Sequence, residues 1–299
     1  MRERGNRTLE ADPRRERTLP GVRREPPQPW PGLERAMRHP PDHGEETYRG
    51  TGKLVGRRAL VTGGDSGIGR AVAIAFAREG ADVAISYYDE HEDAQETLGW
   101  IRREERRSLA IQGDLSRPAH CREVVSQVVS EFGGLDLLVN NAGRQTMRER
   151  LEDLPPEQLE TTFQTNFFAM VYLCQAALEH MAPGSVILNT GSVTALRGSR
   201  HLVDYAATKA AIHNFTKSLA DQLAERGIRV NAVAPGPVWT PLIVSTNDAE
   251  AIEQFGRHSA WHRPAQPAEI APSYVFLASD EARYYTGEVL APTGGETTR

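Results

Sequence analysis

From residue 53 onward, short apolar runs alternate with longer stretches in which apolar side chains recur at helical spacing. The short runs predict buried strands at 58–62, 82–87, 108–112, 135–140, 184–190, 228–233 and 287–291. The longer stretches predict helices near 68–79, 91–106, 117–132, 157–181, 203–226 and 267–278. Regular alternation of strand and helix implies right-handed crossovers and a parallel sheet covered on both faces. The pattern therefore indicates an α/β protein with one doubly wound, seven-stranded parallel sheet, which fills residues 53–299 as a single domain.

Residues 1–52 form an N-terminal arm that lacks this pattern. Its first half is rich in arginine and its second half in proline, and such a segment cannot bury much apolar surface by itself. Acidic residues interleave with the arginines, which favours a solvated tail over an arm that binds nucleic acid or a membrane. We expect the first part to be disordered. We expect residues 26–52 to lie extended over the domain or a neighbouring subunit, because they carry four apolar anchors: Trp30, Leu33, Met37 and Tyr48.

Composition narrows the function classes. A net charge of −5 and a pI near 6.0 give no reason to expect nucleic-acid binding. No apolar run reaches the roughly 18 residues of a membrane span. Cys121 and Cys174 lie in helical patterns without metal-ligand spacing, so we interpret them as reduced core thiols of a cytoplasmic protein. The histidines lack such spacing too, and we predict no metal site.

The glycine-rich stretch after the first predicted strand carries the first candidate chemistry. It reads Thr62-Gly63-Gly64-Asp65-Ser66-Gly67-Ile68-Gly69 and leads into a predicted helix. Glycines let the backbone turn sharply and approach a pyrophosphate, while free N–H groups and the helix dipole face the anion. A tight turn whose small residues serve only for packing is the alternative. We predict that a pyrophosphate is bound at this turn, by Gly63, Asp65, Ser66, Gly67, Ile68 and Gly69.

Other polar and small residues also follow predicted strands, where ligands of such sheets bind. Asp114-Leu115 follows the third strand, and Asn140-Asn141-Ala142-Gly143 follows the fourth. Asn140 can bond backbone groups across the sheet, and Ala142 and Gly143 leave room for a ribose.

The last three motifs lie farther along the chain. Gly191-Ser192 closes the fifth strand, and the sixth ends in Pro235-Gly236-Pro237-Val238-Trp239-Thr240. Tyr205 and Lys209, four residues apart, share one face of the helix between them.

In this order the motifs resemble the ordinary oxidoreductase branch of the short-chain dehydrogenase/reductase family. That branch carries Thr-Gly-x-x-x-Gly-Ile-Gly, Asn-Asn-Ala-Gly and Tyr-x-x-x-Lys. Ser192 precedes Tyr205 by 13 residues, and Asn166 lies in the preceding long helix, as in the family. The arm, with Pro41-Asp42-His43-Gly44, is similar to that of a bacterial-type subgroup. The resemblance covers about residues 53–295 and implies a Rossmann-like fold and a homotetramer.

The resemblance also implies catalytic roles for Asn166, Ser192, Tyr205 and Lys209. Tyr205 is the expected general acid/base, and Ser192 the group that holds the substrate oxygen. Lys209 is expected to bond the nicotinamide ribose, and Asn166 to hold a water in a proton relay. A tyrosine with a pKa near 10 is a poor base. We therefore expect the Lys209 ammonium and the positive nicotinamide to lower the pKa of Tyr205.

The remaining family roles concern the cofactor. In the family, the counterparts of Asp114 and Leu115 cradle the adenine, although Asp114 can equally cap the helix that begins near Pro118. The stretch holding Pro235, Gly236, Val238 and Thr240 binds the carboxamide. Tyr87 stands where NAD-specific members carry an Asp that bonds the ribose. Ser66 stands where many NADP-preferring members carry a basic residue. The missing carboxylate at 87 favours NADP(H) slightly over NAD(H).

Residues 196–203 and 240–263 are expected to wall the substrate pocket, with Trp239 beside them, and 240–263 to form a lid. Arg197 or Arg200 can hold an anionic substrate, but a solvated arginine is the simpler interpretation. The sequence thus predicts a dehydrogenase/reductase of CH–OH groups that moves a hydride between NAD(P)(H) and a small aldehyde, ketone or sugar alcohol. A dinucleotide-sensing regulatory protein without turnover is the alternative, and it would be expected to lack Tyr205 or Lys209.

Overall fold

The computed structural model describes residues 12–14 and 24–296. The disorder predicted for the first part of the arm falls almost entirely outside these residues. Seven parallel strands form one sheet in the order β3-β2-β1-β4-β5-β6-β7, which confirms the predicted doubly wound architecture. The strands are β1 (Arg58–Thr62), β2 (Asp82–Tyr87), β3 (Ser108–Gln112), β4 (Leu137–Asn140), β5 (Val186–Thr190), β6 (Arg229–Val233) and β7 (Val289–Leu290).

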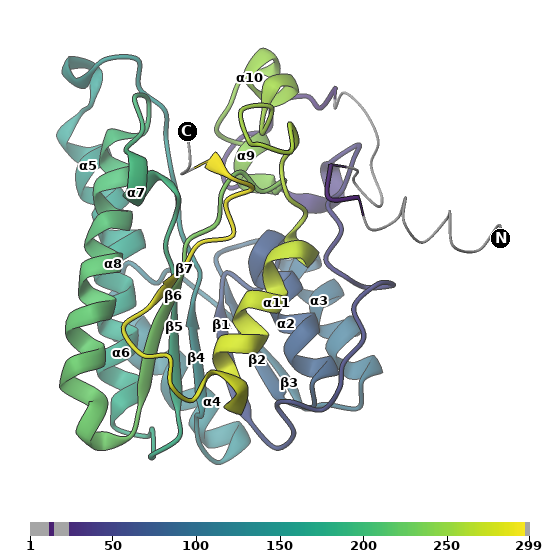
Figure 1. Cartoon of the computed structure of the whole chain (residues 1–299), viewed down its shortest axis with the longest axis vertical. Helices are drawn as coiled ribbons and strands as arrows, with labels where there is room; N and C mark the ends of the chain where they lie inside the picture. The colour runs from purple at the N-terminus through teal and green to yellow at the C-terminus, as the bar shows by residue number, and fades with distance from the viewer. Residues whose placement is uncertain (1–11, 15–23, 297–299) are drawn as a thin grey trace, which may run out of the picture.

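Helices cover both faces of the sheet (Figure 1). One face packs against α2 (Gly67–Arg78), α3 (His91–Arg103) and α11 (Pro267–Ala278), and the other against α4 (Pro118–Phe132), α6 (Ala169–Leu178) and α8 (Val203–Leu223). Successive side chains of a strand point to opposite faces, so Ala59 and Val61 enter one core and Leu60 the other. Because both faces are buried, the strands are apolar along most of their length.

The long helix predicted at 157–181 is present without a break at 156–178, but it contains a π-helical turn. It consists of α5 (Pro156–Phe163), the π-helical turn η3 (Gln164–Phe168), and α6. Such turns occur often at functional sites because they redirect a side chain. Here the turn carries Asn166, which is buried.

Short helices complete the end of the molecule above the strands' carboxyl ends. They are η1 (Glu34–Ala36), α7 (Thr194–Arg197), α9 (Pro241–Val244) and α10 (Ala249–Gln254). These helices are too short to show a period in the sequence, which is why pattern alone did not predict them.

The arm lies along the α2 and α11 side of its own domain (Figure 1). The end of the arm is held by the buried carboxylate of Glu79. This carboxylate accepts hydrogen bonds from Tyr48 Oη at 2.5 Å and from the N–H groups of Thr51 and Lys53 at 2.9 Å each. Farther back, Asp42 N–H donates to Gln266 Oε1 at 2.9 Å.

Trp239 corrects one expectation about the substrate pocket. It is fully buried and donates its indole N–H to the carbonyl of His39 at 2.8 Å. Its ring belongs to a small apolar cluster with Met37, Ile243, Val244 and Ile252. Trp239 therefore joins the arm to α9 and α10 instead of walling a pocket.

Within the described part of the chain, no helix is long and apolar enough to cross a membrane, and no group of three or more potential metal ligands occurs. Cys121 and Cys174 are buried and free.

Candidate active site

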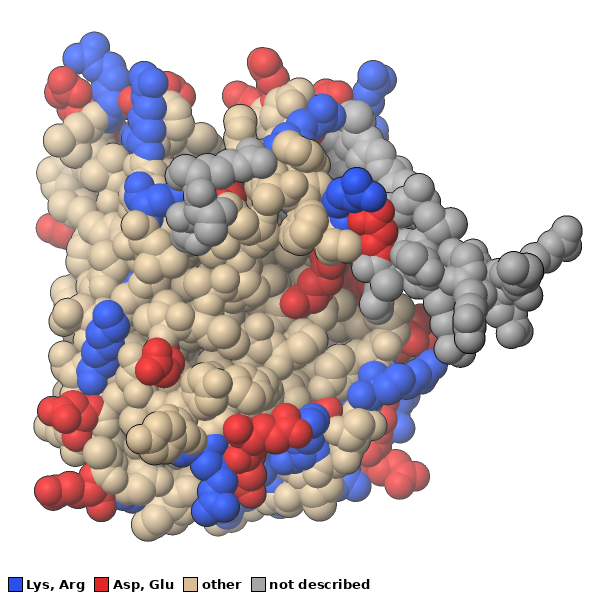
Figure 2. Space-filling model, viewed as in Figure 1, with Lys and Arg blue, Asp and Glu red and all other residues tan. Residues whose placement is uncertain are grey.

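The carboxyl ends of the strands open into one cleft with a volume of about 630 Å³. This volume lies in the usual range for ligand sites, roughly 300–1,000 Å³. In Figure 2 the surface is notched at this end, between the α5 and α7 side and the α9 and α10 side. The predicted site residues that line the cleft are Gly63, Asp65, Ser66, Gly67, Ile68, Tyr87, Asp114, Leu115, Ala142, Gly143, Ser192, Tyr205, Lys209, Pro235, Gly236, Val238 and Thr240. Three predicted residues lie behind its wall: Gly69, Asn140 and Asn166.

The glycine-rich turn has the geometry of a phosphate cradle. Gly67 adopts a φ of 50°, which disfavours any side chain, and a Cβ there would lie 3.0 Å from Thr240 Cγ2. A Cβ at Gly69 would lie 1.8 Å from the carbonyl oxygen of Gly63, so α2 packs directly on the turn. Only glycine fits at these two positions: Gly67 lines the cleft, where it allows the close approach of a dinucleotide's pyrophosphate, and Gly69 lies behind it, where it allows α2 to pack on the turn.

Asn140 and Asp114 have structural roles in the chain. Asn140 Nδ2 donates to Asn189 Oδ1 at 2.9 Å and ties β4 to β5. Asp114 Oδ1 accepts from the N–H of Ser116 at 2.9 Å, whereas the residue that caps α4 is Arg117. Asp114 thus shapes the loop before the helix without capping it, and it still lines the cleft where an adenine is expected.

The catalytic candidates meet where β5 and α8 come together. Ser192 Oγ accepts from Thr194 N at 3.1 Å and from Thr194 Oγ1 at 2.9 Å, which fixes the hydroxyl of Ser192. Lys209 Nζ donates to the carbonyl of Thr190 at 2.7 Å and lies 5.4 Å from the centre of the Tyr205 ring. The three groups therefore surround one corner of the cleft, where a substrate oxygen can meet two hydroxyls.

Burial dominates the electrostatics of this corner. It lowers the pKa of Lys209 to about 8 and raises the pKa of Tyr205 to about 12, the latter against the opposing effect of a hydrogen bond to Ser192. We expected Lys209 to lower the pKa of Tyr205. In the chain itself burial sets the direction, opposed only by the hydrogen bond to Ser192, so the phenol keeps its proton at neutral pH.

Asn166 connects the π-helical turn to the loop after β4. Its Oδ1 accepts from Arg144 N at 2.8 Å, and its Nδ2 donates to the carbonyl of Arg144 at 2.9 Å and to Thr208 Oγ1 at 3.1 Å. The amide is thus committed to holding the backbone of Arg144, and it lies beside Gly143, not in the cleft wall.

The end of the cleft beside β2 is acidic. Asp65, which is buried, and Glu90 both line it. Burial and the neighbouring Glu90 raise the pKa of Asp65 to about 7, and burial raises the pKa of Glu90 as well. The hydroxyl of Tyr87 contacts His91 Nδ1 at 2.9 Å. The charge at this end of the cleft therefore changes near neutral pH.

The opposite end carries the residues expected to select the substrate. Arg197 lines the cleft and pairs with Glu296 at 3.4 Å, so its charge is matched within the chain. Phe255 and His258 also line the cleft, but Trp261 and His262 do not. The prediction that residues 240–263 wall the substrate pocket is thus correct for some of these residues and wrong for others.

Several residues that line the cleft were not predicted. Trp30, Pro31 and Gly32 come from the arm, and Arg144 directly follows the Asn-Asn-Ala-Gly motif. The position of Arg144 in the sequence is a usable signal. The arm residues give none, because their partners lie far away in the chain.

A family model described as enoyl-(acyl carrier protein) reductase matches residues 63–297. The chain belongs to the short-chain dehydrogenase/reductase family. It is 49% identical over 271 residues to the glucose and ribitol dehydrogenase of Daucus carota, with 89% of this chain and 93% of that protein covered. It is 48% identical over 272 residues to the NADPH-dependent aldehyde reductase 1, chloroplastic, of Arabidopsis thaliana, with 89% and 94% covered.

Among solved structures, the chain is similar to a short-chain dehydrogenase from Burkholderia cenocepacia in complex with NADP. The TM-score is 0.77 with 39% sequence identity, and the match covers 82% of this chain and 99% of that one. As a member of this family, the protein is an NAD(P)-dependent oxidoreductase of alcohol and carbonyl groups.

Proposed function

We propose that the protein reduces small aldehydes or ketones, or oxidises the corresponding alcohols including sugar alcohols, with NADP(H) as the preferred cofactor. The observation that carries the proposal is the meeting of Ser192, Tyr205 and Lys209 in one corner of the cleft that begins at the glycine-rich turn. The relatives named for ribitol and aldehyde support the substrate class, and those named for NADP and NADPH support the cofactor.

The proposed mechanism assigns each side chain one task. When bound, the nicotinamide supplies or accepts the hydride. During reduction, Tyr205 gives its hydroxyl proton to the carbonyl oxygen, and during oxidation the phenolate takes that proton back. Ser192 orients the substrate oxygen and stabilises its developing charge. Lys209 supplies positive charge beside the Tyr205 ring, and Asn166 holds the loop that carries Arg144.

The substrate end favours a small, uncharged, hydroxyl-bearing molecule. Arg197 is already paired with Glu296, so an anionic substrate would have to displace a carboxylate. Ser199, His201 and Asn247 also line the cleft and offer hydrogen-bonding groups to a polyol.

The proposal extends to a homotetramer in the cytoplasm. Figure 2 shows few charged side chains over the middle of the face that α8, β7 and α11 form. Tyr284 is fully exposed beside α11, and Leu290 of β7 is 37% exposed, which suits burial against a second copy. The two free, buried thiols suit a reducing compartment.

The deciding experiment is Tyr205→Phe assayed against a panel of aldehydes, ketones and sugars. We expect turnover to vanish while the Kd for NADPH, measured by calorimetry, changes little. Retained turnover would refute the mechanism. Tight cofactor binding by the native protein with no turnover on the panel would instead favour a dinucleotide-sensing regulatory protein.

A further inference from the structure

The arm crosses the dinucleotide cleft at residues 30–32. Trp30, Pro31 and Gly32 line the cleft together with the glycine-rich turn. The crossing is fixed to α9, because Gln28 N donates to the carbonyl of Val244 at 2.8 Å and Ser245 Oγ donates to the carbonyl of Pro31 at 3.1 Å. The arm is thus a built wall of this cleft.

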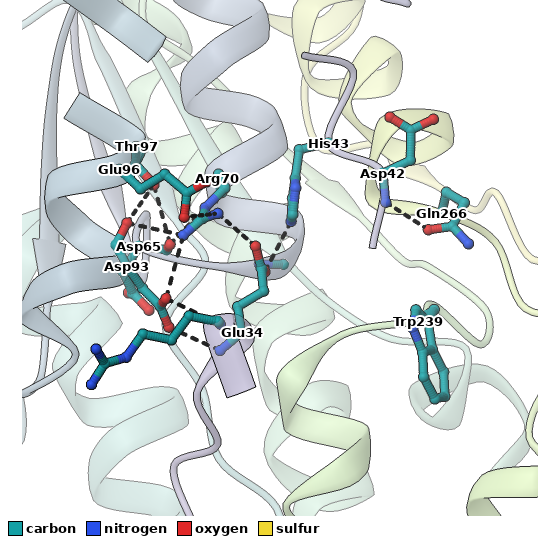
Figure 3. A network of polar contacts seen from close by, with 12 residues as sticks. Glu34, Asp42, His43, Asp65, Arg70, Asp93, Glu96, Thr97, Trp239 and Gln266 are labelled. Atoms are coloured by element: carbon teal, nitrogen blue, oxygen red, sulfur yellow. Dashed lines mark hydrogen bonds and ion pairs between the residues drawn. The ribbon is translucent and has the colours of Figure 1, made fainter. Parts of the chain in front are cut away.

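Glu34 attaches the crossing to the start of α2. Its Oε2 accepts from the N–H of Gly67 at 3.0 Å and contacts His43 Nε2 at 2.9 Å, and its Oε1 pairs with Arg70 Nη1 at 2.6 Å. Its own N–H donates to Asp93 Oδ2 at 2.9 Å. Figure 3 shows Arg70 and His43 directed at the Glu34 carboxylate and Asp93 beside its backbone, and these four residues are buried. The position of Trp30, four residues earlier, is therefore tied to the phosphate cradle.

Trp30 spans the end of β1. Its ring lies 5.5 Å from the ring of Tyr88, which follows β2, and 4.7 Å from the guanidinium carbon of Arg144, which follows β4. In the sheet, β1 lies between β2 and β4. Because the Trp30 ring contacts the residues that follow both of these strands, it must lie across the carboxyl end of β1, where the glycine-rich turn begins.

Arg144 differs from the other two cations of the cleft. Lys209 donates to the carbonyl of Thr190, and Arg197 pairs with Glu296. Over residues 12–14 and 24–296, the guanidinium of Arg144 makes no ion pair with a carboxylate, and it lies over the ring face of Trp30. Its backbone is held from both sides by Asn166. A cation on a fixed backbone that faces the cleft suits a phosphate, because guanidinium groups bind phosphate oxygens with two parallel hydrogen bonds.

We propose that Arg144, held on the ring of Trp30, binds the pyrophosphate of the dinucleotide from the side opposite the α2 N-terminus. The arm is then part of the cofactor site, with Trp30 as a positioning residue. This rests on the proposed function only in requiring a dinucleotide cofactor.

The test compares cofactor affinity among purified full-length variants. We expect Arg144→Gln to raise the Kd for NADH and for NADPH by about tenfold or more, since it removes hydrogen bonds to a charged group. The native Kd should also rise more steeply with salt than that of Arg144→Gln, because the variant has lost a charge pair. Trp30→Leu should raise both Kd values severalfold. Trp30→Phe keeps an aromatic face, so its Kd values should stay close to those of the native protein. The matched control is Arg150→Gln, an arginine of the same loop that pairs with Glu152 outside the cleft.

Three outcomes would overturn the proposal. One is a Kd for Arg144→Gln within twofold of the native value while its thermal unfolding is unchanged. A second is a loss confined to NADPH, which would place Arg144 on the 2′-phosphate. A third is an equal loss in Arg150→Gln. Failure of the proposed function looks different, because the native protein would then bind the cofactor without turning over any substrate.

Discussion

Replacing Glu34 by Gln tests the electrostatic core that holds the arm. The side chains of Glu34, Arg70 and His43 are each 3% exposed or less, and Gln keeps the shape of Glu while removing its charge. Removing one partner of a buried ion pair costs about 3–5 kcal/mol. Arg70 retains Glu96 at 3.2 Å and His43 retains Glu45 at 2.8 Å, so we expect the lower end, about 3 kcal/mol. Thermal unfolding should then shift down by roughly 6–12 °C, at about 2–4 °C per kcal/mol.

The pH dependence makes this prediction specific to His43. Burial alone would lower the pKa of His43, but Glu34 and Glu45 outweigh burial and raise it from 6.5 to about 9. A group whose pKa is raised on folding contributes stability that is full below pH 6.5 and is lost as the pH rises through 9. For the native protein this loss is on the order of 3 kcal/mol.

The assay is thermal unfolding from pH 6 to pH 9.5 for the native protein, Glu34→Gln and Glu46→Gln. Glu46 is an exposed glutamate of the same arm and serves as the control. We expect the native protein and the control to lose stability across this window, and Glu34→Gln to start lower and lose less. An equal pH-dependent loss in Glu34→Gln and the native protein would refute the reasoning.

Three further predictions concern the cleft and the arm. The preference for NADPH over NADH should narrow from pH 6 to pH 8, because Asp65, whose pKa is raised to about 7, becomes charged and repels a 2′-phosphate. Binding titrations at both pH values check this, and a ratio of the two Kd values that does not change with pH would contradict it. The rate of alcohol oxidation should rise from pH 7 to pH 10, while the rate of carbonyl reduction stays level, because burial raises the pKa of the Tyr205 proton donor to about 12. Initial rates in both directions measure this, and an oxidation rate that falls over this range would exclude Tyr205 as the base. Glu79→Ala should lower the free energy of unfolding by about 1–3 kcal/mol, because it leaves the hydrogen-bond donors of Tyr48, Thr51 and Lys53 without their acceptor. Limited proteolysis should then cut the arm sooner, and an unchanged cleavage rate would show that Glu79 does not hold the arm.

The sheet and its motifs could be predicted because their signals are local. The apolar runs of the strands, the glycine-rich turn and the spacing of Ser192, Tyr205 and Lys209 all stand within short stretches of sequence. The parallel direction of the strands followed from the alternation of strand and helix, since parallel strands require crossovers.

The remaining features depend on contacts between distant segments. Glu34 is one of the many acidic residues of the chain until α2 brings Arg70 and the N–H of Gly67 to it. The π-helical turn at Asn166 has no signature in the spacing of apolar residues, because one residue inserted in a helix barely disturbs the period. Trp239 stands next to a stretch expected to line the pocket, yet it is buried, because the arm passes over it and the carbonyl of His39 accepts its indole N–H.

The arm precedes the domain in the chain, yet several of its contacts need segments that come much later. The partners of Glu34 on α2 come early, since Gly67 follows it by only 33 residues. Asp42 must wait for Gln266, 224 residues later, and the carbonyl of His39 for Trp239, 200 residues later. An incomplete chain can therefore form the contacts of Glu34 with α2, but the arm lacks the anchors of His39 and Asp42 until Trp239 and Gln266 have emerged.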